Sequence, residues 1–230
     1  MTFCAHADAG ALWAAVAGRI AGQLQAALSA GRSASLVVSG GRSPVPLFER
    51  LTALLLDWSR VRITLADERW VPTDSDASNE KLVRTHLLQG QAASAEFIGL
   101  KNDASTPAAG AAHAWRDCGA LTRPFDAVVL GLGEDGHFAS LFPASPGLEG
   151  ALDPDAAPAC VGMTAPVPPQ PRISFNLSAL LDARLLLLPL VGARKWQVCQ
   201  TAQSAGPATD LPLRALLRQQ CVTLEIHHTP

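Results

Sequence analysis

The 230-residue sequence lacks tyrosine altogether, and aromatic residues make up only 5% of it. Neither sign of charge dominates, because 18 Lys and Arg stand against 20 Asp and Glu, for a formal net charge of −2. Proteins that bind nucleic acid or anionic membranes through their charge carry a basic excess, so the sequence predicts neither partner. The hydrophobic fraction of 48% is enough for a sizeable core and excludes intrinsic disorder.

Long apolar runs and paired cysteine motifs are also missing. The most apolar run, residues 185–193, contains Pro189 and is too short to span a bilayer. No basic residue precedes Arg19, so the N-terminus lacks the basic segment of a signal peptide. The five cysteines form an odd set with no CxxC spacing, a pattern typical of reduced thiols in a reducing compartment. We expect a soluble, cytoplasmic protein.

Helical and strand-like segments alternate along the chain. Apolar residues recur every four positions from Leu12 to Leu28, which predicts a helix with one buried stripe. Further helices are predicted near residues 45–58, 80–88, 108–121, 192–203 and 213–219, and strands near residues 35–38, 61–65, 97–98, 125–130, 184–189 and 222–225. This alternation predicts an α/β fold, a mainly parallel sheet with helices on both faces in a Rossmann-like three-layer arrangement. We expect residues 1–230 to form one domain, with loops at residues 67–79 and in the proline-rich residues 154–171.

Ligands of such sheets bind beyond the carboxyl ends of the strands, so the residues that follow each predicted strand are the candidates for a site. Residues 39–44 combine two glycines with flanking hydroxyls just before a helix. Free N–H groups and the helix dipole favour an anion there, although an ordinary capped turn is the alternative. The segment lacks a Walker lysine, so nucleoside triphosphate binding is not predicted. Residues 67–70, 131–137 and 192–195 follow three other strands.

Residues 131–136 have the GxGxxG form of a dinucleotide-binding turn, but two acidic residues would face the pyrophosphate, and no second strand ending in an acid follows. A better interpretation is a glycine turn that presents His137 for acid–base chemistry, with Asp135 beside it. Asp67 and Arg69 alternate along an extended segment, so both could face the cleft, with a surface ion pair as the alternative. No histidines, cysteines and carboxylates cluster with metal-ligand spacing, so we predict no catalytic metal.

Several of these segments together resemble a known family. Residues 38–44 (VSGGRSP), 67–72 (DERWVP) with Ser78 and Asn79, and 131–143 (GLGEDGHFASLFP) resemble, in order, motifs of the glucosamine-6-phosphate isomerase/6-phosphogluconolactonase family, on its lactonase side. Residues 169–174 (PQPRIS) and 192–196 (GARKW) are similar to its two later signatures. The resemblance implies the α/β fold that glucosamine-6-phosphate deaminase and ribose-5-phosphate isomerase share.

The resemblance also implies a reaction, the hydrolysis of 6-phospho-D-glucono-1,5-lactone to 6-phosphogluconate in the oxidative pentose phosphate pathway, without a cofactor. By this resemblance His137 activates water, with Asp135 and Asp67 beside it in the catalytic group. The substrate and its phosphate would be held by Ser39, Gly40, Gly41, Arg42, Ser43, Arg69, Arg172 and Lys195.

Two alternatives stay open at this point. One is a deaminase or isomerase on the same fold, which calls for a further acid beside residues 135–137, whereas no acid follows before Glu149. The other is a non-catalytic sugar-phosphate sensor. The expected partner is a small phosphorylated sugar lactone, and the sequence does not define the oligomeric state.

Overall fold

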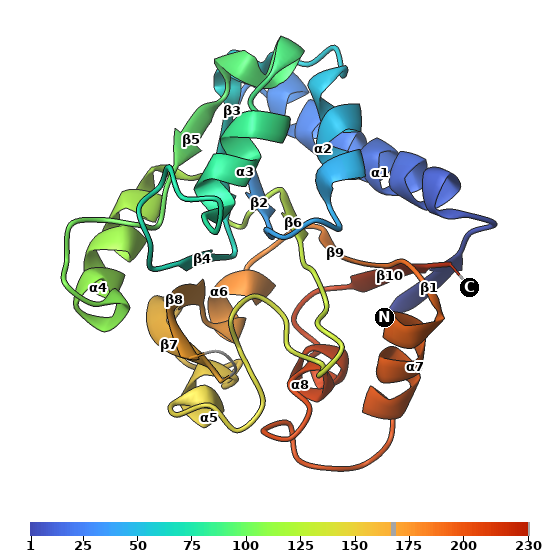
Figure 1. Ribbon diagram of the computed structural model, residues 1–230. Coiled ribbons are helices and arrows are strands. Elements are labelled where there is room, and N and C mark those ends of the chain that lie inside the picture. The colour runs from blue at the N-terminus through green and yellow to red at the C-terminus, as the bar shows by residue number, and fades with distance from the viewer. Residues whose placement is uncertain (167–168, 230) are drawn as a thin grey trace.

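Parallel strands form the main sheet of the computed structural model, which describes residues 1–166 and 169–229 (Figure 1). Seven strands within these residues pair in the order β1-β10-β9-β6-β2-β3-β5. Their bounds are β1 (Thr2–Ala5), β2 (Ala34–Val38), β3 (Val61–Leu65), β5 (Glu96–Ile98), β6 (Ala127–Val129), β9 (Leu186–Leu190) and β10 (Leu224–His228). Every residue of β2 and β9 is buried, as expected of central strands covered on both faces. The predicted α/β class is confirmed.

Helices flank this sheet. The longest, α1 (Ala9–Ser29), lies across β2, β6, β9 and β10 and buries the stripe that begins at Leu12. The others are α2 (Val45–Thr52), α3 (Asn79–His86), α4 (Pro107–Asp117), α5 (Leu148–Ala151), α6 (Leu177–Leu181), α7 (Ala193–Ala202) and α8 (Leu213–Arg218). Helix α2 is shorter than predicted: it ends at Thr52, and Trp58 begins a separate 3-10 turn and donates its indole N–H to the Leu54 carbonyl at 3.0 Å. No helix among the described residues is long and apolar enough to cross a membrane.

A second, antiparallel sheet lies where the sequence predicted loops, and both loop predictions are wrong in part. Its strands are β4 (Asp67–Arg69), β8 (Pro169–Phe175) and β7 (Cys160–Pro166), in the order β4-β8-β7. The prolines are compatible with pairing because Pro166 and Pro169 form the last pair of the β7–β8 hairpin. Pro171 takes part through its carbonyl, which accepts the Trp70 N–H at 2.9 Å and requires no N–H from the proline.

The order of strands reverses at the pair β2 and β6. From β2 the chain continues to β3 and β5 on one side, whereas β6, β9 and β10 follow on the other side. The loops after β2 and β6 therefore leave in opposite directions, and such a switch point opens a crevice at the carboxyl ends of the strands. The two loops are joined at their base, because Ser39 N–H donates to the Val129 carbonyl at 3.0 Å and Gly131 N–H donates to Ser39 Oγ at 3.1 Å.

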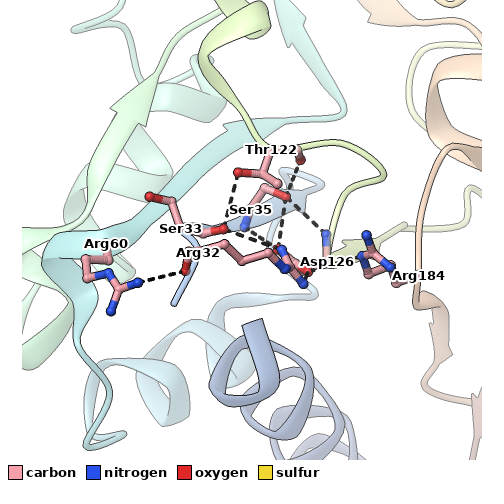
Figure 2. Close-up of polar contacts among 7 residues, drawn as sticks. All are labelled: Arg32, Ser33, Ser35, Arg60, Thr122, Asp126 and Arg184. Atoms are coloured by element: carbon pink, nitrogen blue, oxygen red, sulfur yellow. Dashed lines mark hydrogen bonds and ion pairs between the residues drawn. The ribbon is translucent and has the colours of Figure 1, made fainter. Parts of the chain in front are cut away.

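A buried carboxylate joins the same two strands at their opposite, amino ends (Figure 2). Asp126 is fully buried and accepts bonds from Arg32 Nη1 at 2.9 Å and Nη2 at 2.5 Å, and from Ser35 N–H at 2.9 Å. Arg184 Nε lies 3.6 Å from the same carboxylate. A charge this deeply buried is tolerated when it is paired and hydrogen-bonded. The network thus stabilises the amino ends of β2 and β6. It lies away from their carboxyl ends, where a ligand site is expected.

Candidate active site

A cavity of about 620 Å³ lies at the carboxyl ends of the main-sheet strands, where the small sheet faces them. Its volume falls in the range of small-molecule sites. The three predicted catalytic residues, His137, Asp135 and Asp67, all line it. Seven of the eight predicted substrate-binding residues also line it, namely Ser39, Gly40, Gly41, Ser43, Arg69, Arg172 and Lys195. Arg42 does not line the cavity, and it is exposed on the loop.

A tight glycine turn after β6 carries His137. Gly133 N–H donates to the His137 carbonyl at 2.8 Å, and Gly136 N–H donates to the Gly133 carbonyl at 3.0 Å. Gly136 adopts the left-handed φ of 81°, which glycine tolerates without strain. A Cβ on Gly133 would lie 2.2 Å from the imidazole ring of His137, so only glycine lets the ring fold back over the turn. The chain continues in turns rather than in the helix of a dinucleotide-binding motif.

Asp135 holds the imidazole of His137 in one orientation. Its Oδ1 lies 2.5 Å from His137 Nδ1, and the ring of His137 packs on Phe142 with the two centroids 4.4 Å apart. Burial acts to raise the pKa of the Asp135 carboxyl, but the hydrogen bond and charge of His137 outweigh it and lower that pKa below its ordinary value. An ionised carboxylate only accepts hydrogen bonds, so Nδ1 carries the proton in the neutral imidazole. The lone pair is then on Nε2, as a general base requires.

Two arginines from the small sheet, Arg69 and Arg172, also line the cavity, and we call them the arginine wall. They are direct partners in the β4–β8 pairing. Burial lowers the pKa of Arg172, and the positive charge of Arg69 lowers it further, while the charges of Asp67 and Glu68 act in the opposite direction. In the part of the chain that the structure describes, the Nε atoms of both arginines are buried without a hydrogen-bond partner. Like charges side by side destabilise a sheet unless an anion compensates them.

Glu68, between the two cavity-lining residues of β4, is fully buried and fixes this strand against helix α3. Its carboxylate accepts the N–H groups of Arg69, Asn79 and Glu80, each at 2.7 Å, and the Ser78 hydroxyl at 3.0 Å. Burial raises the pKa of Glu68, and these four hydrogen bonds oppose that rise. The strand that carries Asp67 and Arg69 therefore has a rigid support behind the cavity.

Asn79 and Ser140 support the site as well, although neither was predicted as a site residue. Asn79 lines the cavity and donates from Nδ2 to the Asp67 carbonyl at 2.8 Å. It also requires glycine at position 40, since a Cβ there would lie 1.9 Å from Asn79 Oδ1. Ser140 Oγ donates to Asp67 Oδ2 at 2.5 Å. Both residues belong to segments that carry the family resemblance, and this was the one signal in the sequence that could have found them.

The glycine loop after β2 faces the start of helix α7. Gly41 has a left-handed φ of 88°, and the exposed Ser43 accepts a hydrogen bond from Lys195 Nζ at 3.2 Å. Burial lowers the pKa of Lys195, partly offset by the charge of Glu134. The loop and Lys195 thus form a second cationic region of the cavity. Among residues 1–166 and 169–229, no three His, Cys, Asp or Glu side chains are grouped so as to hold a metal ion.

Comparisons with known proteins find relatives over nearly the whole chain. The family described as glucosamine-6-phosphate isomerases/6-phosphogluconolactonase matches residues 7–224. A 6-phosphogluconolactonase of Pseudomonas aeruginosa is 44% identical over 215 residues, which cover 94% of this chain and 89% of that protein. The crystal structure of a 6-phosphogluconolactonase from Shewanella baltica is 45% identical, with a TM-score of 0.95 over 100% of this chain and 98% of that one. A monomeric glucosamine-6-phosphate deaminase shares the fold, with a TM-score of 0.79 at 16% identity over 99% of this chain and 97% of that one. The chain therefore belongs to the glucosamine-6-phosphate isomerase/6-phosphogluconolactonase family.

Proposed function

We infer that this protein is a 6-phosphogluconolactonase, which hydrolyses 6-phospho-D-glucono-1,5-lactone to 6-phospho-D-gluconate in the oxidative pentose phosphate pathway. The observation that carries the inference is the placement of an oriented base and two cationic regions around one cavity. A lactone is an activated ester, so its hydrolysis needs a positioned water, a base and hydrogen-bond donors for the oxyanion. The lining residues supply the base and the cations that a phosphorylated lactone requires.

His137 is the general base in this proposal. Its Nε2 takes a proton from a water molecule as the water oxygen attacks the lactone carbonyl carbon. The bond between that carbon and the ring oxygen then breaks, and the proton passes from Nε2 to the ring oxygen, which becomes a hydroxyl group. The Asp135 carboxylate stabilises the imidazolium between these two proton transfers and keeps Nδ1 protonated throughout. The carboxylic acid product ionises in water.

The cationic regions hold the phosphate and the sugar. In our proposal the glycine loop with Lys195, together with Arg172, binds the 6-phosphate, and Arg69 faces the rest of the substrate. The support for this is electrostatic, because two partly buried arginines stand side by side, each with a buried Nε that has no hydrogen-bond partner among the described residues, and an anion would offset their repulsion. Asp67, buried beside them, supplies part of the compensating charge. Arg42 is not part of this proposal because it does not line the cavity.

A deaminase or isomerase is the alternative within the family. Such an enzyme moves a proton at carbon 2 and opens a sugar ring, which requires an acid beyond the His137–Asp135 pair. The acidic residues that line the cavity are Asp135 and Asp67. Asp67 is engaged by Ser140 at 2.5 Å and faces the arginine wall, so it is poorly suited to proton transfer. A sugar-phosphate sensor would not need the oriented base that this cavity contains.

The experiment is an assay of the purified protein with 6-phosphogluconolactone, with the spontaneous hydrolysis subtracted, beside an assay of ammonia release from glucosamine 6-phosphate. We expect catalysed hydrolysis and no ammonia. His137→Ala should fold, because the ring is about one-third exposed, and should lose a factor of about 10² to 10⁴ in rate. Ammonia release by the wild-type protein, or full activity of His137→Ala, would refute the assignment.

We also propose that residues 1–230 form one domain, supported by a cluster of buried hydrophobic residues that extends, within the described residues, from Leu12 to Ile226. A cytoplasmic location is proposed as well. It is supported by the five free cysteines, which suit a reducing compartment.

A further inference from the structure

Ser140 links the segment that carries His137 to the small sheet that carries the arginine wall. It follows His137 by three residues, is fully buried, and comes directly after Ala139. Its hydroxyl donates to Asp67 Oδ2 at 2.5 Å, and its N–H donates to Ser174 Oγ at 3.2 Å. Asp67 belongs to β4 and Ser174 to β8. A single residue of the His137 segment is thus bonded to both strands that bear the arginine wall.

The backbone beside Ser140 requires such support. Ala139 has a φ of 48°, in the left-handed region that residues with a side chain rarely adopt. A residue persists in this conformation where the surrounding structure holds it. The hydrogen bonds within the glycine turn, between Gly133, Gly136 and His137, fix the shape of the turn but not its distance from the small sheet. The bonds from Ser140 cross that gap.

Asp67, which accepts the hydrogen bond of the Ser140 hydroxyl, also interacts with the arginine wall. Asp67 is buried, and its charge favours the protonated form of Arg172. A hydrogen bond to a charged acceptor is stronger than one between neutral groups. Asp67 therefore connects two parts of the cavity. Its charge interacts with Arg172 of the arginine wall, and its hydrogen bond with Ser140 reaches the segment that carries His137.

We propose that Ser140 is a positioning residue, which holds His137 at its working distance from the arginine wall through Asp67 and Ser174. This inference rests on the proposed lactonase function. A substrate bound at the wall by its phosphate would then meet the base at a fixed distance. Misplacement by about 1 Å is enough to slow a reaction by about 10²-fold.

The test compares Ser140→Ala with Ser145→Ala. Ser145 is a buried serine of the same segment, but its hydroxyl donates to the local Phe142 carbonyl at 2.8 Å and does not reach the small sheet. Ser140→Ala should lower kcat by about 10- to 100-fold. The loss should be larger for 6-phosphogluconolactone than for unphosphorylated gluconolactone, which has no phosphate to bind at the wall, and KM for the former should change little. Ser145→Ala should keep the wild-type kcat.

A double-mutant cycle adds a readout that a general loss of stability would not reproduce. If Ser140 acts through Asp67, then Asp67→Asn combined with Ser140→Ala should be little worse than the more damaging single variant. Ser174→Ala, which removes the acceptor of the Ser140 N–H, should also lower kcat more than KM, and it carries the test if Ser140→Ala fails to fold.

Three results would overturn the proposal: wild-type kcat in folded Ser140→Ala, a loss confined to KM, or an additive cycle. A wild-type protein without lactonase activity would overturn the proposed function and this inference together. An active wild-type protein with an unaffected Ser140→Ala would overturn the role of Ser140 alone.

Discussion

Replacement of Asp135 by asparagine is the most direct perturbation of the base. The two side chains have the same shape, but the carboxamide can donate to His137 Nδ1 as well as accept from it, and it carries no charge. The 2.5 Å bond between Nδ1 and Oδ1 would no longer define which nitrogen holds the proton. The imidazolium formed during the reaction would also lose its counter-charge. Both effects act on the general base, whose contribution is typically about 10² to 10⁴ in rate, so we expect kcat to fall within that range.

The assay follows acid release from the lactone in a weakly buffered solution with an indicator, after subtraction of spontaneous hydrolysis. Glu134→Gln is the matched control, because it removes a neighbouring carboxylate whose ion pair with Arg194, at 2.9 Å, lies on the surface. Such exposed pairs contribute about 0–1 kcal/mol, so the control should retain its kcat and its thermal midpoint. Asp135→Asn should lower its midpoint only slightly near neutral pH, since Asp135 is itself nearly half exposed. An Asp135→Asn enzyme with a kcat within about threefold of wild type would refute the orienting role.

The lowered pKa of Asp135 also predicts how the stability difference between wild type and Asp135→Asn changes with pH. The pKa of Asp135 is lowered in the folded protein, so the folded state favours the ionised form. Its contribution to the free energy of unfolding is fully present above the unfolded-state pKa of about 3.9 and is lost as pH falls through the folded-state value. The difference in stability between wild type and Asp135→Asn should therefore be constant near neutrality and shrink below about pH 4. A difference that grew as pH fell would contradict this sign.

Three further predictions concern the proposed phosphate site, the dependence of activity on a metal ion, and the buried Asp126 network. Arg172→Ala should raise KM for the phosphorylated lactone by about 10- to 150-fold, the equivalent of about 1.5–3 kcal/mol for a charged hydrogen bond. Unphosphorylated gluconolactone should be unaffected, and equal losses on both substrates would contradict a phosphate role. Exhaustive EDTA treatment should leave full activity and no stoichiometric metal in elemental analysis; activity lost with chelator and restored by zinc or magnesium would overturn the mechanism. Asp126→Ala should lower the free energy of unfolding, measured in urea, by about 3 kcal/mol. This is the lower end of the range for a broken buried ion pair, because the Arg32 side chain is one-third exposed. A change below about 1 kcal/mol would refute a stabilising role for the network.

The main sheet and its helices could be predicted because their residues carry local patterns. The stripe from Leu12 to Leu28 repeats with the period of a helix, and β9 is a continuous apolar run of the kind that central parallel strands require. Strand β1 was not predicted, since it is a short edge strand whose residues are mostly exposed and leave no periodic signal. It forms because it pairs with β10, at the other end of the chain.

The small sheet could not be predicted from local pattern for a related reason. β4 reads Asp-Glu-Arg and β8 begins with prolines, compositions that normally indicate loops. What makes β4 a strand is its pairing with β8, more than a hundred residues later in the chain. Arg172 was therefore found through the family resemblance, whereas His137 and Lys195 follow from the rule that ligands bind at strand ends. Ser140 and Asn79 are single buried polar residues whose roles depend on Asp67, 73 and 12 residues away in the sequence, and neither shows a local periodic pattern.

The connection between the two sheets explains how the site is assembled. Ala66 lies between β3 of the main sheet and β4 of the small sheet, and its backbone bonds to both. Its N–H donates to the Val38 carbonyl of β2, and its carbonyl accepts the Phe175 N–H of β8, each at 2.9 Å. The arginine wall is thereby fixed relative to the strand that leads into the glycine loop, while His137 comes from the separate turn after β6. In the function we propose, anion binding and acid–base chemistry thus reside on different elements, which offers a physical reason why one fold serves proteins named for different reactions of 6-phosphorylated sugars.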